Sequence, residues 1–268
     1  MTKINIIKDF LVFLFVYLPP LLIFIRFSRE RKRSYLLLTI ISILYIVTSL
    51  FTQNLIPFIF VLINIRYLKV AERTCYNSTK NEYTSPCELN ISIKPTISGR
   101  LAEDYNRFKF SIRNLNLLSA IKYTIQSYLI TILISAISAG IFYRLNVDAK
   151  QQEIVTWMSS MPLKRFLIMV PSVTIFAPIL EEFVFRWLLF EKIFRPRIGI
   201  YLSAILSSII FAFIHFNLKA LPILIWIGIY NCYLINKKGY WYSVFNHFTF
   251  NFVTTMVLLA QKLGETRF

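Results

Sequence analysis

The chain has 268 residues, of which 56% are hydrophobic, 16% aromatic and only 16% charged. Globular domains are about 45–50% apolar and about 25% charged, so this composition leaves too little polar surface for a soluble domain. The 30 Lys and Arg residues outnumber the 13 Asp and Glu residues, which gives a formal charge of +17. Such a charge fits nucleic-acid binding, an anionic membrane surface or topology signals between spans, and the positions of the charges decide among them.

Apolar runs divide the chain into segments long enough to cross a bilayer, which takes about 17–25 residues in a helix. We predict helices over residues 6–25, 35–51, 55–68, 121–143, 166–190, 199–217, 221–235 and 240–260. The third and the seventh are short enough to need tilt or burial in protein, so seven spans is the alternative to eight. The predicted fold class is all-α, a polytopic membrane helix bundle of about eight transmembrane helices in the lipid bilayer.

The basic residues collect on one side of this bundle. With the loops placed alternately, 20 of the 30 Lys and Arg residues fall on one side, mostly in segments 26–34 and 66–122, and 9 on the other. Because Lys and Arg concentrate in cytoplasmic loops, this pattern places both termini outside. The charge is then mostly a topology signal, and no nucleic-acid partner is expected. We expect an integral, multi-pass protein, and the Ile-, Lys-, Asn- and Phe-rich composition suits a bacterial cell membrane.

The segment 66–122 is the long insertion between spans. Its polar composition predicts a loop, with a short amphipathic helix around residues 101–118. Cys75 and Cys87 are expected to be free thiols in a cytoplasmic loop, with a disulfide as the alternative, and the sequons at Asn77 and Asn90 are expected to arise by chance. Cys232, inside a span, is expected to be a small packing residue.

Few ionisable side chains fall inside the predicted spans, where each costs at least about 2.5–3.5 kcal/mol. Glu181, Glu182 and Arg186 lie in the fifth run, and the two histidines of the chain, His215 and His247, lie in the sixth and the last. Taken singly, each fits a hydrogen-bonded packing residue or an intrahelical pair. Their concentration in the last third of the chain favours a functional site.

Helical spacing sorts these residues further. Glu182 and Arg186 are four residues apart, which predicts a structural charge pair on one helix face, while Glu181 is rotated by about 100° and can face a cavity. The pairs Phe211 with His215 and His247 with Asn251 are also four residues apart.

These residues carry a family resemblance. Glu181-Glu182-Phe183-Val184-Phe185-Arg186 has the pattern EExxxR, Phe211-Ala212-Phe213-Ile214-His215 the pattern FxxxH, and His247-Phe248-Thr249-Phe250-Asn251 the pattern HxxxN. In this order the motifs resemble the CAAX-protease and bacteriocin-processing (CPBP/Abi) family of intramembrane proteases. We therefore divide the chain into residues 1–120, N-terminal membrane helices and a cytoplasmic loop with no family match, and residues 121–268, a CPBP/Abi-like protease domain. One departure is Asn231-Cys232, where the family usually has a small residue.

The resemblance implies an intramembrane endopeptidase that cleaves a peptide or membrane-associated protein, in a CAAX-type, peptide-processing or self-immunity role. It implies that Glu181 and His215 activate a water molecule and that His247 and Asn251 hold the oxyanion, with Phe211 as motif support. A partly desolvated carboxylate suits such a base, and an imidazole and an amide one turn apart can both donate to one oxygen. A cavity opening toward the cytoplasm is expected around them.

Two alternatives stay open. Glu181, His215 and His247 also form the ligand set of a divalent metal site such as zinc, although the chain has no HExxH pattern. In that case the protein is a metalloprotease, whereas otherwise no cofactor is required. The alternative function is a catalytically silent membrane scaffold or a peptide-toxin immunity protein. A transporter is less favoured, because its charged groups are expected along a path through several helices.

Overall fold

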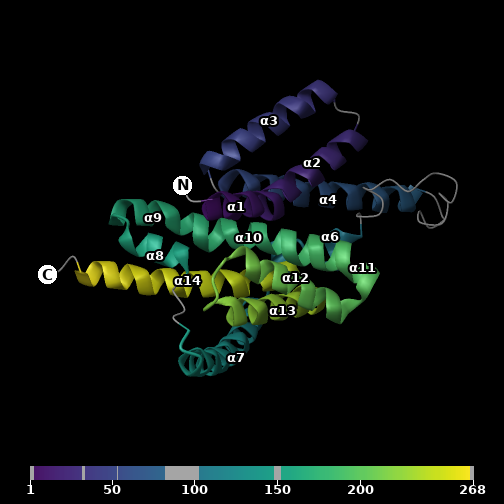
Figure 1. Cartoon of the computed structure of the whole chain (residues 1–268). Helices are drawn as coiled ribbons and strands as arrows, with labels where there is room; N and C mark the ends of the chain where they lie inside the picture. Colours follow the sequence, from purple (N-terminus) through teal and green to yellow (C-terminus); the bar gives the residue numbers. More distant parts are fainter. Residues whose placement is uncertain (1–2, 32–33, 53, 82–102, 148–151, 266–268) are drawn as a thin grey trace.

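The computed structural model describes residues 3–31, 34–52, 54–81, 103–147 and 152–265. The described residues are almost entirely helical and include no strand, which confirms the all-α class (Figure 1). The predictions for Cys87 and Asn90 lie outside the described residues, as do those for the side chains of Cys75 and Asn77.

The elements follow one another as α1 Lys3–Val12, η1 Phe13–Tyr17, α2 Leu18–Glu30, α3 Tyr35–Thr52, α4 Leu55–Asn81, α6 Asp104–Arg107, η2 Ile112–Asn114, α7 Leu117–Arg144, α8 Glu153–Ser160, α9 Leu163–Pro171, η3 Ser172–Phe176, α10 Ala177–Glu181, η4 Glu182–Phe194, α11 Arg195–Ile198, α12 Ile200–Ile214, α13 Leu221–Lys237 and α14 Tyr240–Glu265. Here η1, η3 and η4 are π-helical and η2 is a 3₁₀ turn.

Each of the eight predicted helices has a counterpart in the structure. α4 continues to Asn81, beyond the predicted end at 68, because helical backbone does not stop where the apolar run stops. α8 was not predicted, and the amphipathic helix predicted around 101–118 is reduced to the short turns α6 and η2.

Five helical stretches are long and apolar enough to cross a membrane. They are Ile6–Arg29, Tyr35–Thr52, Leu117–Arg144, Leu163–Ile198 and Tyr240–Gly264, and α12 is a shorter apolar helix. The protein is therefore an integral multi-pass membrane protein, and the choice between seven and eight spans remains a prediction.

Proline interrupts the helical hydrogen bonding in the stretch that carries the two intramembrane acids. Pro171 ends α9 directly before η3, and Pro178 lies near the start of α10, which leads into η4. Proline has no N–H to donate, so nearby carbonyls must find other partners. In π-helical segments the bonds run from residue i to i+5, and such segments are rare and recur at functional sites. Glu182 and Arg186 both lie in η4.

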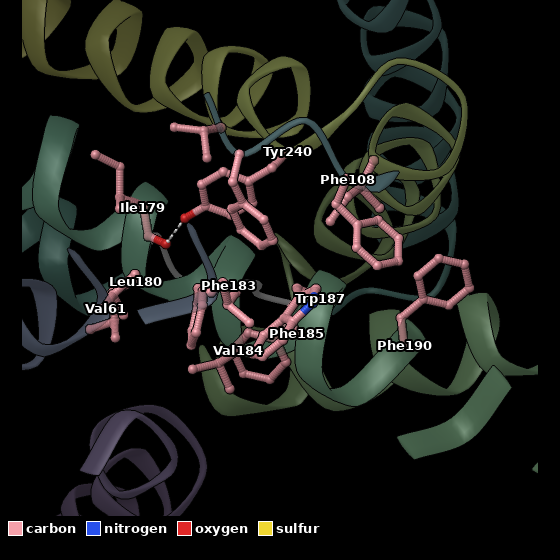
Figure 2. Packing of buried hydrophobic residues seen from close by; sticks show 14 of the residues in the cluster. Val61, Phe108, Ile179, Leu180, Phe183, Val184, Phe185, Trp187, Phe190 and Tyr240 are labelled. Carbon is pink, nitrogen blue, oxygen red and sulfur yellow. Dashed lines mark hydrogen bonds between the residues drawn. The ribbon is translucent and has the colours of Figure 1, made fainter. Parts of the chain in front are cut away.

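The continuous helix from α9 to α11 runs through the middle of the molecule (Figure 1). α4 packs against its α10 portion from one side, while α12 and α14 pack against η4 from the other. Buried aromatic side chains pack where η4 meets the start of α14, as Figure 2 shows for Phe183, Trp187 and Tyr240. The Tyr240 hydroxyl donates a hydrogen bond of 2.6 Å to the carbonyl of Ile179. This packing fixes the start of α14 against the helix that carries the acids.

Residues 103–116, which precede α7, cover the end of the bundle where the sequence places most of the Lys and Arg residues. The backbone N–H of Tyr240 donates to the Phe108 carbonyl at 2.7 Å, and Trp241 Nε1 donates to the Phe110 carbonyl at 2.7 Å. Gly239 makes this approach possible: its φ is +117°, and a Cβ there would lie 2.8 Å from Cβ of Lys109. The segment thus covers the cytoplasmic side assigned by the charge pattern.

Candidate active site

The residues singled out in the sequence come from three neighbouring parts of the fold. They are Glu181 at the end of α10 with Glu182 and Arg186 in η4, Phe211 and His215 at the end of α12, and His247 and Asn251 on α14. Because α12 and α14 both pack against η4, the three sequence motifs meet in one region.

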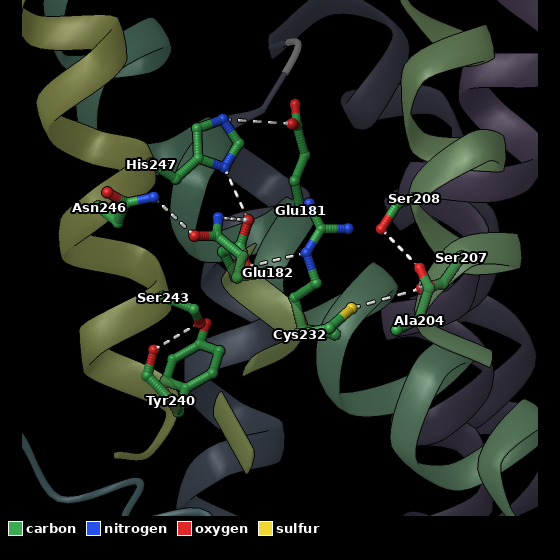
Figure 3. Close-up of polar contacts among 12 residues, drawn as sticks. Glu181, Glu182, Ala204, Ser207, Ser208, Cys232, Tyr240, Ser243, Asn246 and His247 are labelled. Carbon is green, nitrogen blue, oxygen red and sulfur yellow. Dashed lines mark hydrogen bonds and ion pairs between the residues drawn. The ribbon is translucent and has the colours of Figure 1, made fainter. Parts of the chain in front are cut away.

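Glu182 lies at the centre of the buried polar network in Figure 3. Its side chain is completely buried, and its Oε1 accepts hydrogen bonds of 2.9 Å from Nδ1 of His247 and from Nδ2 of Asn231. Its Oε2 lies 3.3 Å from Nε of Arg186, which is also completely buried. A buried carboxylate is tolerated only with such partners, because removing a charge from water is costly. Glu182 is thus a structural centre.

Glu181 has a different environment from its neighbour. Its Oε2 lies 3.7 Å from Nε2 of His247, so this imidazole lies between the two acids (Figure 3). The side chain of Glu181 is 17% exposed, whereas that of Glu182 is 0% exposed. A carboxylate with accessible surface can meet a water molecule, and one that is enclosed cannot. Of the two acids, Glu181 is therefore the one available for chemistry.

The hydrogen bonds of the two histidines define which ring nitrogen is available. Nδ1 of His215 contacts the Phe211 carbonyl at 2.8 Å, and Nδ1 of His247 contacts the Glu182 carboxylate at 2.9 Å. Carbonyl and carboxylate oxygens only accept, so both Nδ1 atoms carry the proton and donate it. Nε2 of each ring remains for other partners, and in a neutral imidazole it is the basic nitrogen.

The ring of Phe211 links the three motifs. It is completely buried, and its centroid lies 4.7 Å from that of His215 and 5.7 Å from that of His247. Cζ of Arg186 lies over the same ring at 4.4 Å from its centroid.

Two predicted site residues are held apart from this network. Asn251 donates from Nδ2 to the Val173 carbonyl in η3 at 2.9 Å, and His215 makes its side-chain hydrogen bond within its own helix. Within the described ranges, no hydrogen bond or ion pair joins either of them to Glu181. Among the described residues the predicted pair of Glu181 with His215 is thus not joined by a hydrogen bond, and the imidazole that forms an ion-pair contact with Glu181 is that of His247.

Two asparagines belong to the network although sequence reasoning assigned them no role. Asn231, read from the sequence as a departure in a helix contact, donates to Glu182, and Asn246 donates at 2.8 Å to Oδ1 of Asn231. Both are completely buried. Their presence inside apolar runs was the available signal, because an unpaired amide in hydrocarbon is costly. Helices α12 and α13 approach each other closely here, since a Cβ on Gly228 of α13 would lie 2.6 Å from Cβ of Ser208 on α12.

The structure brings together only two of the three candidate metal ligands Glu181, His215 and His247. Across the described stretches from residue 3 to residue 265, no three His, Cys, Asp or Glu side chains come together as a metal-binding group. Glu181 and His247 are neighbours, and because Nδ1 of each histidine is already bonded, Nε2 is the nitrogen that either ring could offer to a metal ion. Within the described residues, His215 belongs to no such group.

An apolar cavity of about 500 Å³ lies at the end of α12, remote from the closed basic end. It is lined by Leu11, Phe15, Ile210, Phe213, Ile214, Phe216, Asn217, Leu218 and Leu221. Its walls therefore come from the first membrane helix and from the residues on both sides of His215. The cavity expected around the motif residues, opening toward the cytoplasm, stays a prediction.

A comparison with protein families supports the resemblance. Residues 163–253 match the family described as type II CAAX prenyl endopeptidase Rce1-like. No curated protein and no solved structure matches the chain. The matched segment runs from the start of α9 to two residues past Asn251 and so contains all three motifs. It is narrower than the protease-like domain expected at residues 121–268 and covers about a third of the chain.

The fold and the match together indicate a multi-pass membrane protein with a segment that is similar to a protease family. Residues 163–253 are thus similar to the Rce1-like family of CAAX endopeptidases, which confirms the predicted resemblance.

Proposed function

We propose that this protein is an intramembrane endopeptidase in which Glu181, assisted by His215, activates the water that hydrolyses a peptide bond. The observation that carries the proposal is the position of Glu181, partly exposed and 3.7 Å from His247 where the three motifs meet. Residues 121–268 form the catalytic domain in this proposal, since both histidines and both intramembrane acids lie within it.

The reaction follows from the side chains. As the water oxygen bonds to the substrate carbonyl carbon, the Glu181 carboxylate takes one water proton, and Nε2 of His215 can accept a hydrogen bond from the same water. The carbonyl electron pair moves to oxygen. Asn251 has a second amide hydrogen beyond the one donated to Val173. Together with His247, which donates from Nε2 when both of its ring nitrogens carry a proton, it is the proposed oxyanion donor, such donors being worth about 2.7–4 kcal/mol each. The C–N bond then breaks, and the proton on Glu181 passes to the leaving nitrogen.

The family description suggests a broad class of substrate, a peptide or a membrane-associated protein. A membrane-associated protein cleaved near its C-terminus, as in CAAX-type processing, and a bacterial peptide precursor both suit a site inside the bilayer. In this proposal the protein acts in a bacterial cell membrane.

Comparative peptidomics tests the proposal. Cells producing equal amounts of the wild type, Glu181→Ala and His215→Ala are compared for membrane-derived peptides. We expect a set of cleavage products that is present with the wild type and absent with both variants. If a wild-type phenotype survives both substitutions and no peptide changes, the protease proposal fails, and the silent scaffold or immunity protein takes its place.

A further inference from the structure

The aromatic ring of Phe211 belongs to the buried apolar cluster and also contacts the polar residues of the site. It lies on α12 one turn before His215, and its side chain is completely buried. Its neighbours are the cation of the first motif and the imidazoles of the other two, at 4.4 Å for Arg186, 4.7 Å for His215 and 5.7 Å for His247. One side chain therefore contacts all three motifs.

The contact with Arg186 uses the face of the ring. The guanidinium is completely buried, its Nε faces Glu182 at 3.3 Å, and within the described part of the chain Nη1 and Nη2 have no hydrogen-bond partner. A cation above an aromatic face is attracted by the ring quadrupole, and the attraction is larger when both groups are desolvated. The ring of Phe211 is thus a principal partner of the Arg186 cation.

The contacts with the histidines use a different geometry. The imidazole of His215 is tilted by 64° and that of His247 by 87° relative to the ring, which are edge-to-face arrangements. Such arrangements are favourable and directional, whereas an aliphatic side chain of similar volume offers no preferred ring orientation. The ring therefore restricts both imidazoles.

We propose that Phe211 is a positioning residue, which holds Arg186 against Glu182 and orients both histidines for the water and the oxyanion. Arg186 acts through Glu182, which binds Nδ1 of His247. The effect of Phe211 on catalysis rests on the proposed protease function. Its effect on the orientation of the histidines does not, because that orientation is measurable without a substrate.

The experiment compares full-length wild type with Phe211→Leu, Phe211→Met and Phe211→Tyr in nanodiscs. Phe166→Leu is the matched control, because Phe166 is also completely buried and also has a cation over its ring, Lys262 at 5.6 Å, but lies in a separate cluster. Thermal stability, kcat and KM are measured on a cleaved peptide. The two histidines of the chain are labelled with ¹⁵N, so that only two imidazole spin systems are observed.

Phe211→Leu and Phe211→Met are expected to lower kcat by about 10- to 100-fold and to leave KM within about twofold of the wild type. Phe211→Tyr keeps an aromatic ring and is expected to retain most of the wild-type kcat. Phe166→Leu is expected to keep kcat within about twofold even if it lowers stability equally. Both imidazole signals should broaden or change tautomer in Phe211→Leu and not in Phe166→Leu. Unchanged tautomers and line widths in Phe211→Leu overturn the inference, whether or not any variant cleaves a peptide. Absent cleavage by the wild type contradicts the protease proposal alone.

Discussion

The N-terminal helices and the motif-bearing helices are stabilised in different ways. In the span Tyr35–Thr52, 17% of the most apolar stretch is buried inside the protein, against 44% in Leu163–Ile198. The α3 helix presents large apolar residues such as Leu36, Leu44 and Phe51 outward. Around Glu182, by contrast, charged and amide groups are completely enclosed.

This difference has a physical cause. Lipid is as apolar as leucine, so outward-facing apolar residues lose little when they contact lipid rather than protein. Buried charges and amides have no such substitute, because each unpaired group costs several kcal/mol in hydrocarbon. Substitutions of similar size should therefore have very different effects in the two regions.

The largest effect is expected for Glu182→Gln. This change leaves the completely buried Arg186 without its anion and weakens the bond to His247. Breaking one side of a buried ion pair costs about 3–5 kcal/mol, so the free energy of unfolding should fall by that amount in denaturant titrations in micelles. Glu181→Gln, one residue earlier and partly exposed, is the control for stability. Equal stabilities of the two variants would contradict the structural centre at Glu182.

A smaller effect is expected where α12 and α13 touch. Gly228→Ala places a Cβ 2.6 Å from Cβ of Ser208, so the two helices must separate. Overpacking of this kind costs about 1–3 kcal/mol. The matched change in the other region is Leu44→Ala on α3, where the side chain is 57% exposed and a change below about 0.5 kcal/mol is expected. A larger loss of unfolding free energy for Leu44→Ala than for Gly228→Ala in the same titration would contradict the difference between the two regions.

The smallest effect on stability is expected at the basic end of the bundle, where Asp104 of α6 contacts η4. Asp104 pairs with Lys192 at 2.8 Å and accepts a hydrogen bond from Trp187 at 3.2 Å. Burial raises the pKa of Asp104 above 3.8, although the hydrogen bond and charge of Lys192 and the hydrogen bond from Trp187 act in the opposite direction.

A raised folded-state pKa means that the folded protein binds this proton more tightly than the unfolded chain. The stabilisation is full below pH 3.8 and is lost as the pH rises through the folded pKa of Asp104. The melting temperature of the wild type relative to Asp104→Asn should therefore decrease as the pH rises from 4 toward 7. An increase over the same range would show that the ion pair with Lys192 outweighs burial.

Much of the fold was accessible from the sequence, because apolar runs report directly on membrane helices. The eight predicted helices are present, and so is the meeting of three motifs that the family resemblance implied. Apolar runs identify membrane helices but not helical segments of polar sequence outside the membrane. The extension of α4 to Asn81 and the short helix α8 were therefore not predicted.

The details of the site were less accessible for a different reason. Spacing within one helix shows which residues share a face but not which residues of another helix they meet. Contacts between helices therefore had to come from the structure, among them His247 with both acids and Asn231 with Glu182. The π-helical segment η4 was also missed, since it leaves no separate mark on an apolar sequence.

The proposed activation of water by Glu181 is tested most directly with purified protein in nanodiscs and a peptide identified by peptidomics. Cleavage is followed for the wild type with and without a strong zinc chelator, and for Glu181→Ala. We predict that the wild type keeps its activity in the chelator and that Glu181→Ala loses at least about 100-fold in kcat. Activity that disappears with the chelator and returns with zinc, or that survives in Glu181→Ala, would contradict it.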